Sequence, residues 1–186
     1  MKLYIKNMVC NRCIIAVERV FQDLNLESTT VALGEVETAE DLNSTELRIL
    51  DESLRESGFQ ILEDSAQQLI EKVKNEIILL VDGLDIPEDF ILSKWISEKL
   101  NRDYSAVSKL FSQNENVTLE QYFILQKIEK VKELLLYDEF SLTEISGKLG
   151  YKSVQHLSSQ FRNSTGFTPS GFKKLKVKNR IPLDKI

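Results

Sequence analysis

Hydrophobic residues in the first 64 positions follow two spacings. Some segments alternate apolar and polar residues or form a short apolar run, which predicts strands, while others repeat apolar residues every three or four positions, which predicts amphipathic helices. In chain order the expected elements are a strand at 2–8, a helix at 12–24, a strand at 29–38, a helix at 45–57 and a strand at 59–62. Gly34 is expected to form a bulge or bend within the second strand. This order predicts a small α/β sandwich in residues 1–64.

An amphipathic helix is expected at residues 65–82. Its apolar stripe is either a connector between two parts of the chain or the surface of a homodimer. Gly83 and Pro87 then interrupt the helical pattern. The stripe consists of Leu69, Ile70, Val73, Ile77, Leu80 and Val81.

The chain after residue 87 is predicted to be nearly all helical. Thr118 with Gln121, and Ser141 with Glu144, fit the capping box that begins a helix, and Pro169 fits the first helical position. The expected helices are 88–100, 104–113, 118–136, 142–149, 153–163 and 169–175. The fold class is therefore α+β. Its predicted domains are an α/β domain at 1–64, a connecting helix at 65–86 and an all-α domain at 87–186.

Residues 142–163 have the pattern of a helix-turn-helix, in which a support helix and a tight turn precede a second helix that enters the major groove of DNA. Gly150 suits the turn, because glycine adopts positive φ without steric cost. The buried anchors are expected to be Leu142, Ile145 and Leu149 on the support helix, and Tyr151, Leu157 and Phe161 on the second. The outward residues are then Ser153, Gln155, His156, Ser158 and Ser159, with Lys152 and Arg162 at the margins. Glutamine can contact adenine in two places, serine can contact several base edges, and lysine or arginine can contact phosphate.

Residues 141–174 as a whole resemble the C-terminal signature of AraC-type transcription regulators. The most specific matches are Phe161-Arg162, Gly166, Thr168-Pro169, Phe172 and Lys173. The resemblance extends upstream to about residue 88 and covers roughly half the chain. It implies a bacterial regulator in which two helix-turn-helix units bind double-stranded DNA.

The resemblance also implies that the helix at 118–136 joins the two units. The first unit is then 91–114, and its outward residues Ser105, Ser108 and Lys109 are expected to contact DNA. In this first unit, the sequence Asn114-Glu-Asn-Val-Thr replaces the usual glycine-bearing turn that follows the DNA-contacting helix. The residues matching buried family positions are Trp95, Leu100, Val107 and Phe111.

The net charge of −5 conceals a gradient along the chain. Residues 1–86 carry 8 Lys or Arg against 17 Asp or Glu, whereas residues 151–186 carry 8 basic residues against Asp184 alone. A basic segment attracts the phosphate backbone, although it can also be a solvated tail. Lys173 and Lys174 of this segment are expected to contact DNA.

Cys10 and Cys13 form a C-x-x-C motif at the predicted junction of the first strand and first helix. With no secretory features, this spacing favours a metal site or a redox dithiol over a structural disulfide. The helix N-terminus and Arg12 are expected to lower the thiol pKa values. Two thiolates suffice for Cu(I), whereas Zn(II) normally takes four ligands, and His156 is the only histidine. A zinc site would therefore need a second subunit, and an unmetallated pair or a reversible disulfide stays an alternative.

The segment from Asn7 to Cys13 resembles the metal loop of heavy-metal-associated domains. Gly58-Phe59 falls where those domains place a Gly-aromatic pair, although asparagine replaces the usual glycine at position 7. The resemblance covers about 60 residues. It implies a ferredoxin-like fold, or a reduced variant because 29–38 is short for two strands.

Three functions are compatible with these features. The first is a DNA-binding transcription regulator, in which metal or thiol state at Cys10 and Cys13 controls DNA binding. A metallochaperone-like carrier and a thiol-disulfide redox protein are the others, but neither requires the basic segment or the AraC signature. The sequence contains no Gly-rich phosphate loop, catalytic triad or metal-hydrolase motif, so an enzyme is not expected. The apolar run at 77–81 is too short to cross a bilayer, and a cytoplasmic protein without a membrane partner is expected.

Overall fold

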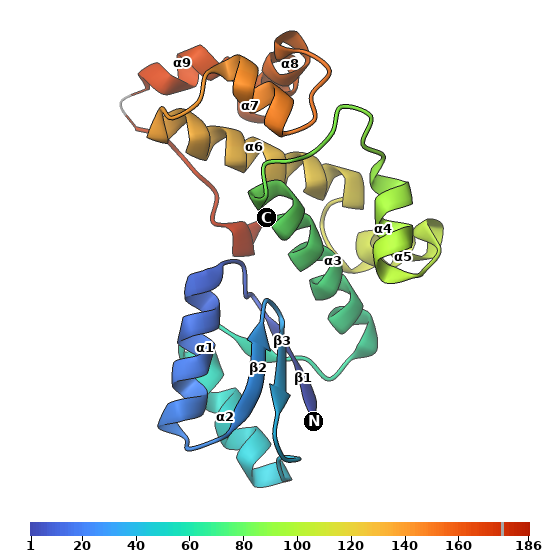
Figure 1. The fold of residues 1–186 in the computed structure, drawn as a ribbon, viewed down its shortest axis with the longest axis vertical. Helices are drawn as coiled ribbons and strands as arrows, with labels where there is room; N and C mark the ends of the chain where they lie inside the picture. The colour runs from blue at the N-terminus through green and yellow to red at the C-terminus, as the bar shows by residue number, and fades with distance from the viewer. Residues whose placement is uncertain (176) are drawn as a thin grey trace. The chain divides into compact units, whose positions relative to one another are not determined.

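The computed structural model describes residues 1–175 and 177–186, which form two compact units, Met1–Asn75 and Glu76–Ile186 (Figure 1). The boundary lies inside helix α3 (Ser65–Asp82), so this helix begins in one unit and ends in the other. Each unit has its own buried residues.

The N-terminal unit is a four-stranded antiparallel sheet with two helices. Strands β1 and β4 are separated in sequence by two helices and a hairpin, yet they pair, and the strand order is β2-β3-β1-β4. The elements before α3 are β1 (Lys2–Lys6), α1 (Asn11–Asp23), β2 (Ser28–Ala32), β3 (Glu35–Thr38), α2 (Ser44–Glu56) and β4 (Gln60–Ile61).

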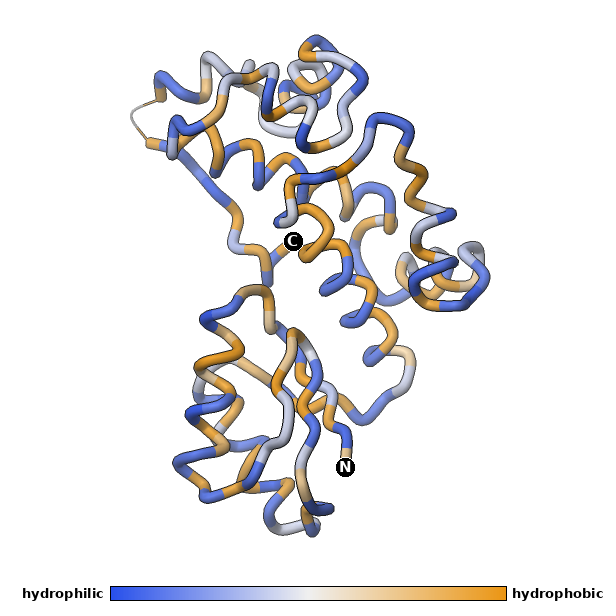
Figure 2. Tube along the Cα trace, in the orientation of Figure 1, coloured by the Kyte–Doolittle hydropathy of each residue, from blue (hydrophilic) through white to orange (hydrophobic). Residues whose placement is uncertain are grey.

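Both helices contribute to one hydrophobic core against the sheet. Ile5 of β1, Phe21 of α1 and Leu54 of α2 are fully buried in the same cluster. Figure 2 shows apolar and polar positions alternating along α1 and α2, as expected for helices that bury one side. Burial of this side is what fixes the two helices on the sheet.

Residues 29–38 form two strands, so the prediction of a single strand is wrong. The loop between β2 and β3 is only Leu33-Gly34, because Ala32 already pairs with Glu35. Gly34 has φ +77°, and its carbonyl accepts a hydrogen bond of 2.9 Å from the amide of Ile5. A two-residue loop leaves enough of the segment for two short strands, which the sequence pattern alone did not separate.

The C-terminal unit is helical and is built around one long helix. Helix α6 (Leu119–Tyr137) packs against α5, α7, α8 and α9 (Figure 1). Residues 88–91, expected to be helical, precede the observed start of α4. The remaining elements are α4 (Leu92–Leu100), α5 (Tyr104–Asn114), α7 (Leu142–Lys148), α8 (Val154–Thr165), α9 (Pro169–Lys174) and the 3₁₀ turn η1 (Leu183–Lys185).

The predicted capping chemistry is confirmed at the starts of α6 and α7. Thr118 and Gln121 bond reciprocally at α6, and Ser141 and Glu144 do so at α7. No helix of the described residues is sufficiently long and apolar to span a bilayer.

Candidate nucleic-acid interface

Helix α8 is anchored on one side and exposed on the other. Leu157 and Phe161 lie one turn apart and are fully buried. Phe161 packs edge-on against Phe172 of α9, with ring centroids 5.6 Å apart. These anchors fix which side of α8 faces solvent, as the sequence predicted.

The exposed side of α8 carries several of the polar residues predicted to contact DNA. Gln155, His156, Ser159 and Arg162 are exposed, while Ser158 is half-buried. Lys152 and Ser153 lie just before the helix and are also exposed. The Ser153 hydroxyl accepts a 3.1 Å hydrogen bond from the amide of His156, so Ser153 caps the helix.

The turn between α7 and α8 rests on a buried lysine of α6. Lys127 donates a hydrogen bond of 3.0 Å to the carbonyl of Leu149, and its ammonium lies 3.8 Å from the ring centroid of Tyr151. Burial lowers the pKa of Lys127 to about 8. Tyr151 is itself buried, which raises its pKa, and its hydroxyl donates to Gln160 of α8 over 2.8 Å. These contacts attach the turn to both α6 and α8.

Helix α5, which belongs to the first helix-turn-helix, is also capped at its start and anchored on one side. The carboxylate of Asp103 accepts a 3.0 Å hydrogen bond from the amide of Ala106 at the N-terminus of α5. Val107 and Phe111 are buried, and Phe111 packs against Tyr122 of α6 with centroids 5.4 Å apart. Of the predicted contact residues, Ser105 and Lys109 are exposed.

Ser108 is less available than its neighbours. It is half-buried and lies close to Tyr104, whose hydroxyl donates a hydrogen bond to Glu120 of α6. Burial is the largest cause that raises the pKa of Tyr104, and the bond from Tyr104 lowers the pKa of Glu120. Ser108 thus belongs partly to the contact between α5 and α6.

Helices α5 and α8 share one register, counted from their caps. A buried aliphatic residue follows four positions after each cap, and a buried phenylalanine follows eight positions after it. In this register Arg102 occupies the position equivalent to Lys152, and Gln113 the position equivalent to Asn163. All four residues are exposed. Arg102 and Gln113 were not among the predicted contact residues. The spacing of eight positions between Asp103 and Phe111 equals that between Ser153 and Phe161, and this match identifies them from the sequence.

Helix α4 buries a different residue from the one predicted. Trp95 is only half-buried and packs against Phe90 with centroids 5.9 Å apart, while its neighbour Ile96 is fully buried. The prediction that Trp95 is a core residue is therefore wrong. A shift of one position rotates the buried side of a helix by about 100°.

Comparisons with known proteins agree with this architecture. The family model of a helix-turn-helix domain matches residues 96–175. These residues are an AraC-type helix-turn-helix domain. The chain is 30% identical over 79 residues to the Msm operon regulatory protein of Streptococcus mutans, a match that covers 42% of this chain and 28% of that protein. It is also 30% identical over 78 residues to the Xylose operon regulatory protein of Haemophilus influenzae, covering 42% of this chain and 20% of that protein. The chain thus spans less than a third of the length of either relative.

A solved structure shares the fold of the AraC-type domain. The C-terminal domain of AraT, a response regulator from Geobacillus stearothermophilus, has a TM-score of 0.50 and 21% sequence identity to this chain. The match covers 61% of this chain and 87% of that domain. At this identity the likeness concerns the fold alone.

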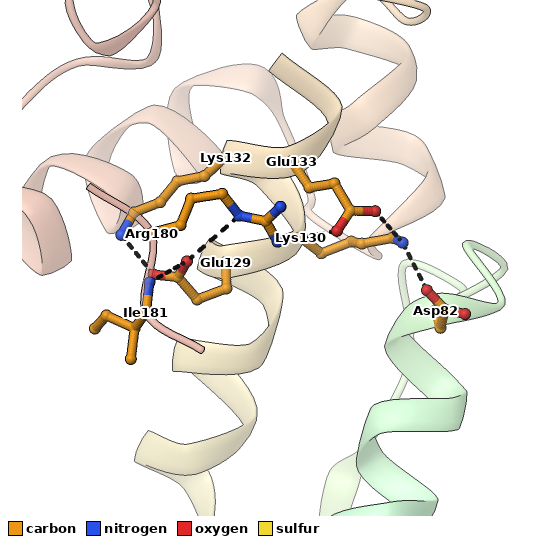
Figure 3. Close-up of polar contacts among 7 residues, drawn as sticks. All are labelled: Asp82, Glu129, Lys130, Lys132, Glu133, Arg180 and Ile181. Atoms are coloured by element: carbon orange, nitrogen blue, oxygen red, sulfur yellow. Dashed lines mark hydrogen bonds and ion pairs between the residues drawn. The ribbon is translucent and has the colours of Figure 1, made fainter. Parts of the chain in front are cut away.

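The basic residues of segment 151–186 are partly paired with acidic residues. Lys173 bonds to Asp138, and Arg180 bonds to Glu133 over 2.9 Å (Figure 3). Lys176 lies outside the described residues. Within the described part of the chain, the basic residues of segment 151–186 without an ion pair are Lys152, Arg162, Lys174 and Lys178.

Arg180 belongs to a polar network on α6. Glu129 is 2% exposed and accepts hydrogen bonds from Lys132 (2.5 Å) and from the amide of Ile181 (3.0 Å) (Figure 3). Arg180 lies between Glu129 and Glu133. The segment around residue 180 is thus bound to α6, and Arg180 is not a free cation of a solvated tail.

Cys10 and Cys13 lie where predicted, at the junction of β1 and α1. Cys10 is exposed, Cys13 is half-buried, and their sulfur atoms are 3.7 Å apart. Burial raises the pKa of Cys13, outweighing the hydrogen bond of 3.5 Å from the amide of Val9. The prediction of a lowered thiol pKa is therefore wrong for Cys13.

The dithiol loop is tied to the loop before β4. Asn7 has φ +71°, a conformation that asparagine tolerates better than most residues, and its side chain donates to the Gly58 carbonyl over 2.9 Å. Asn7 thus adopts a backbone conformation that favours glycine. In the described residues, no group of three or more His, Cys, Asp or Glu is placed to bind a metal ion. Cys10 and Cys13 alone would suffice for Cu(I), whereas a tetrahedral Zn(II) site would need further ligands.

Proposed function

We propose that this protein is a sequence-specific DNA-binding transcription regulator that contacts two adjacent major-groove segments of double-stranded DNA with α5 and α8. The observation that carries the proposal is the shared register of these helices, each with one anchored side and one exposed polar side. A recognition helix needs this combination, because the anchors aim the helix and the polar side meets base edges. The AraC-type domain supports the same function.

The exposed residues of α8 have distinct proposed roles. Gln155 stands near the N-terminus of the helix, where an amide can bond to an adenine at two positions. His156 and Ser159 contact neighbouring base edges or sugar, and Ser158 contributes at the edge of this surface. Lys152, Arg162 and Lys174 contact phosphate.

Helix α5 is proposed to contact the other segment less strongly. Ser105 and Lys109 are its exposed contacts, and Arg102 takes the place that Lys152 has beside α8. Lys173 and Ser108 are assigned supporting roles, because Lys173 is paired with Asp138 and Ser108 is half-buried. Specificity is therefore expected to be greater in the segment that α8 contacts.

Selection from random duplexes tests the proposal with the full chain. The expected result is one enriched site with two conserved segments and an affinity that falls steeply with salt. Gln155→Ala should weaken binding to that site by roughly 10-fold and relax preference at one base pair. Gln22→Ala, an exposed glutamine of α1, is the matched control. No enrichment, or equal effects of both variants, contradicts the proposal.

We further propose that a thiophilic metal, Cu(I) or Zn(II), binds Cys10 and Cys13 and alters DNA binding. The exposed dithiol and its loop support this, as does the strand order β2-β3-β1-β4 with both helices in one core, which is compatible with a ferredoxin-like domain of the heavy-metal-associated type. Bound Zn(II) would neutralise the charge of two thiolates, and bound Cu(I) would neutralise the charge of one. Because the pKa of Cys13 is raised, metal must displace its proton, and affinity should increase with pH.

Titration of the full chain with Cu(I), Zn(II) and peroxide separates the possible roles of the dithiol. Metal control predicts that Cu(I) or Zn(II) changes DNA affinity in the wild type but not in the Cys10→Ser/Cys13→Ser double variant. A response to peroxide alone assigns the dithiol to redox control. Equal DNA affinity of both proteins under all three treatments removes any sensing role.

A homodimer through residues 65–82 has less support than the monomer. Ile70, Val73 and Ile77 of the predicted stripe are buried within the chain, so they are not presented to a second copy. The two recognition helices of one chain can occupy two groove segments without a partner. Light scattering after size-exclusion chromatography tests this, and a dimeric mass that Leu80→Lys abolishes would favour the homodimer.

A further inference from the structure

The segment between α3 and α4, residues 83–91, contacts the turn that leads into α8. We call it the linker. Its residue Ile86 is 2% exposed and donates a 3.0 Å hydrogen bond from its amide to the carbonyl of Lys148. Ile86 also pairs with Leu149 in an isolated parallel β-bridge. The linker therefore bonds directly to the backbone at the end of α7.

Gly150 makes this contact close. Its φ is +65°, and a Cβ built there would lie 2.7 Å from both the Ile86 side chain and the Pro87 carbonyl. Only glycine allows such a conformation and such an approach together. The linker thus fills the space beside the turn, three residues before the cap of α8 at Ser153.

Both ends of the linker are attached to the rest of the C-terminal unit. Just before it, Asp82 pairs with Lys130 of α6 over 2.6 Å (Figure 3). Near its other end, Phe90 packs against Phe123 of α6 and Trp95 of α4, with ring centroids 5.6 and 5.9 Å away. A segment held at both ends and in the middle has little freedom to move relative to α6.

We infer that the linker is a positioning element for DNA recognition, and that Ile86 fixes the orientation of α8 relative to α5. The inference rests on the proposed function of α5 and α8. The linker leads directly into the first helix-turn-helix and packs against the turn of the second, so it connects the two helix-turn-helix motifs in addition to the connection that α6 makes. Ile86 touches no DNA in this proposal; it acts through Leu149 and Gly150.

The consequence is geometric. Two recognition helices can occupy two groove segments at once only when their separation and angle match the DNA. Loosening the turn before α8 should leave contacts of α5 intact while weakening those of α8. It should also widen the range of spacings between the two segments that the protein accepts.

The test uses the full chain and the site selected for the wild type. Ile86→Ala is compared with Ile91→Ala, a linker isoleucine that is 59% exposed. Affinity is measured for the intact site, for a site with the α8 segment scrambled, and for sites with one base pair added or removed between segments. We expect Ile86→Ala to reduce the preference for the intact over the scrambled site by roughly 10-fold, whereas Ile91→Ala behaves as wild type.

A second measurement does not require DNA. Hydrogen exchange at the amides of Gly150 and Tyr151, which bond to carbonyls of α7, should accelerate in Ile86→Ala and not in Ile91→Ala. If Ile86→Ala does not fold, Ile86→Val, which removes one methylene, is measured in the same way. Unchanged exchange and unchanged site preference in a folded Ile86 variant overturn the inference. Accelerated exchange without DNA binding by the wild type leaves the linker contact standing and rejects the proposed function.

Discussion

Lys127 is a charged residue in a position that penalises charge. It is 7% exposed, and its ammonium has one backbone acceptor and the faces of Tyr151 and Phe123 around it. These contacts favour the charged form, but desolvation dominates and lowers the pKa to about 8. The sequence shows only that Lys127 belongs to a helix. Its burial follows from the packing of α6 against the turn between α7 and α8, which lies more than 20 residues later in the chain.

The lowered pKa of Lys127 predicts how stability depends on pH. Below pH 8 the side chain is charged in both the folded and the unfolded chain, so it contributes no pH dependence. Between pH 8 and its ordinary pKa of 10.5, the unfolded chain holds more protons, and raising the pH stabilises the folded state.

Relative to Lys127→Met, which does not titrate, the free energy of unfolding of the wild type should therefore increase from pH 8 to pH 10, by at most about 1.4 kcal/mol per pH unit. Urea unfolding followed by fluorescence of Trp95, the single tryptophan, measures it in the C-terminal unit. A constant difference between the two proteins across this range would contradict a lowered pKa.

Gly34 and Gly58 provide a matched pair for separating backbone strain from steric overlap. Both have positive φ, but a Cβ at Gly34 would lie 2.1 Å from the Asn75 amide nitrogen, whereas a Cβ at Gly58 would meet nothing within 4 Å. Both alanine variants should be destabilised by roughly 1 kcal/mol through backbone strain, with a further loss of about 1–3 kcal/mol in Gly34→Ala. Denaturation of the N-terminal unit followed by circular dichroism tests this. Equal losses would mean that the Asn75 side chain moves away at no cost.

At the scale of elements, interactions between residues close in sequence were sufficient to predict most of the helices but not the pairing of strands in the sheet. The caps at Thr118 and Ser141 are set by residues three positions apart, so the sequence predicts them directly. The hairpin within 29–38 depends on pairing between strands, and Ile96 is buried instead of Trp95 because of contacts between helices. The linker contact at Gly150 joins residues more than 60 positions apart, and no local pattern indicates it.

The cap of α8 gives a prediction about this element alone. Ser153 bonds to the amide of His156 at the helix start, whereas Ser159 is exposed within the helix and caps nothing. Ser153→Ala should lower the free energy of unfolding of the C-terminal unit by about 1 kcal/mol, while Ser159→Ala should change it little because alanine favours a helix. Urea unfolding of the two variants, again followed through Trp95, measures the difference. Similar values for both would show that the cap does not stabilise α8.

At the scale of the whole molecule, charge is divided along the chain more sharply than the net value of −5 indicates. The acidic residues 1–86 disfavour indiscriminate binding to nucleic acid, and the basic end favours it. Pairing within the C-terminal unit reduces the second effect, since Arg180 is held by Glu133 and Lys173 by Asp138. The charge gradient is visible in the sequence, but these ion pairs are not. They form between C-terminal residues and residues of α6 or its C-terminal cap, which are far apart in sequence.

Lys173 and Lys174 are neighbours on α9 that differ in this respect. Lys173 is paired with Asp138, and Lys174 has no ion pair among the described residues. A lysine that contacts phosphate releases about one counterion, so Lys174→Ala should reduce the slope of log affinity against log salt by about 1. Lys173→Ala should reduce it less, because Asp138 already neutralises part of its charge and becomes unpaired in the variant. Binding of the full chain to its selected site from 50 to 300 mM salt distinguishes the two. A larger slope change for Lys173→Ala would mean that this lysine leaves Asp138 for phosphate when DNA binds.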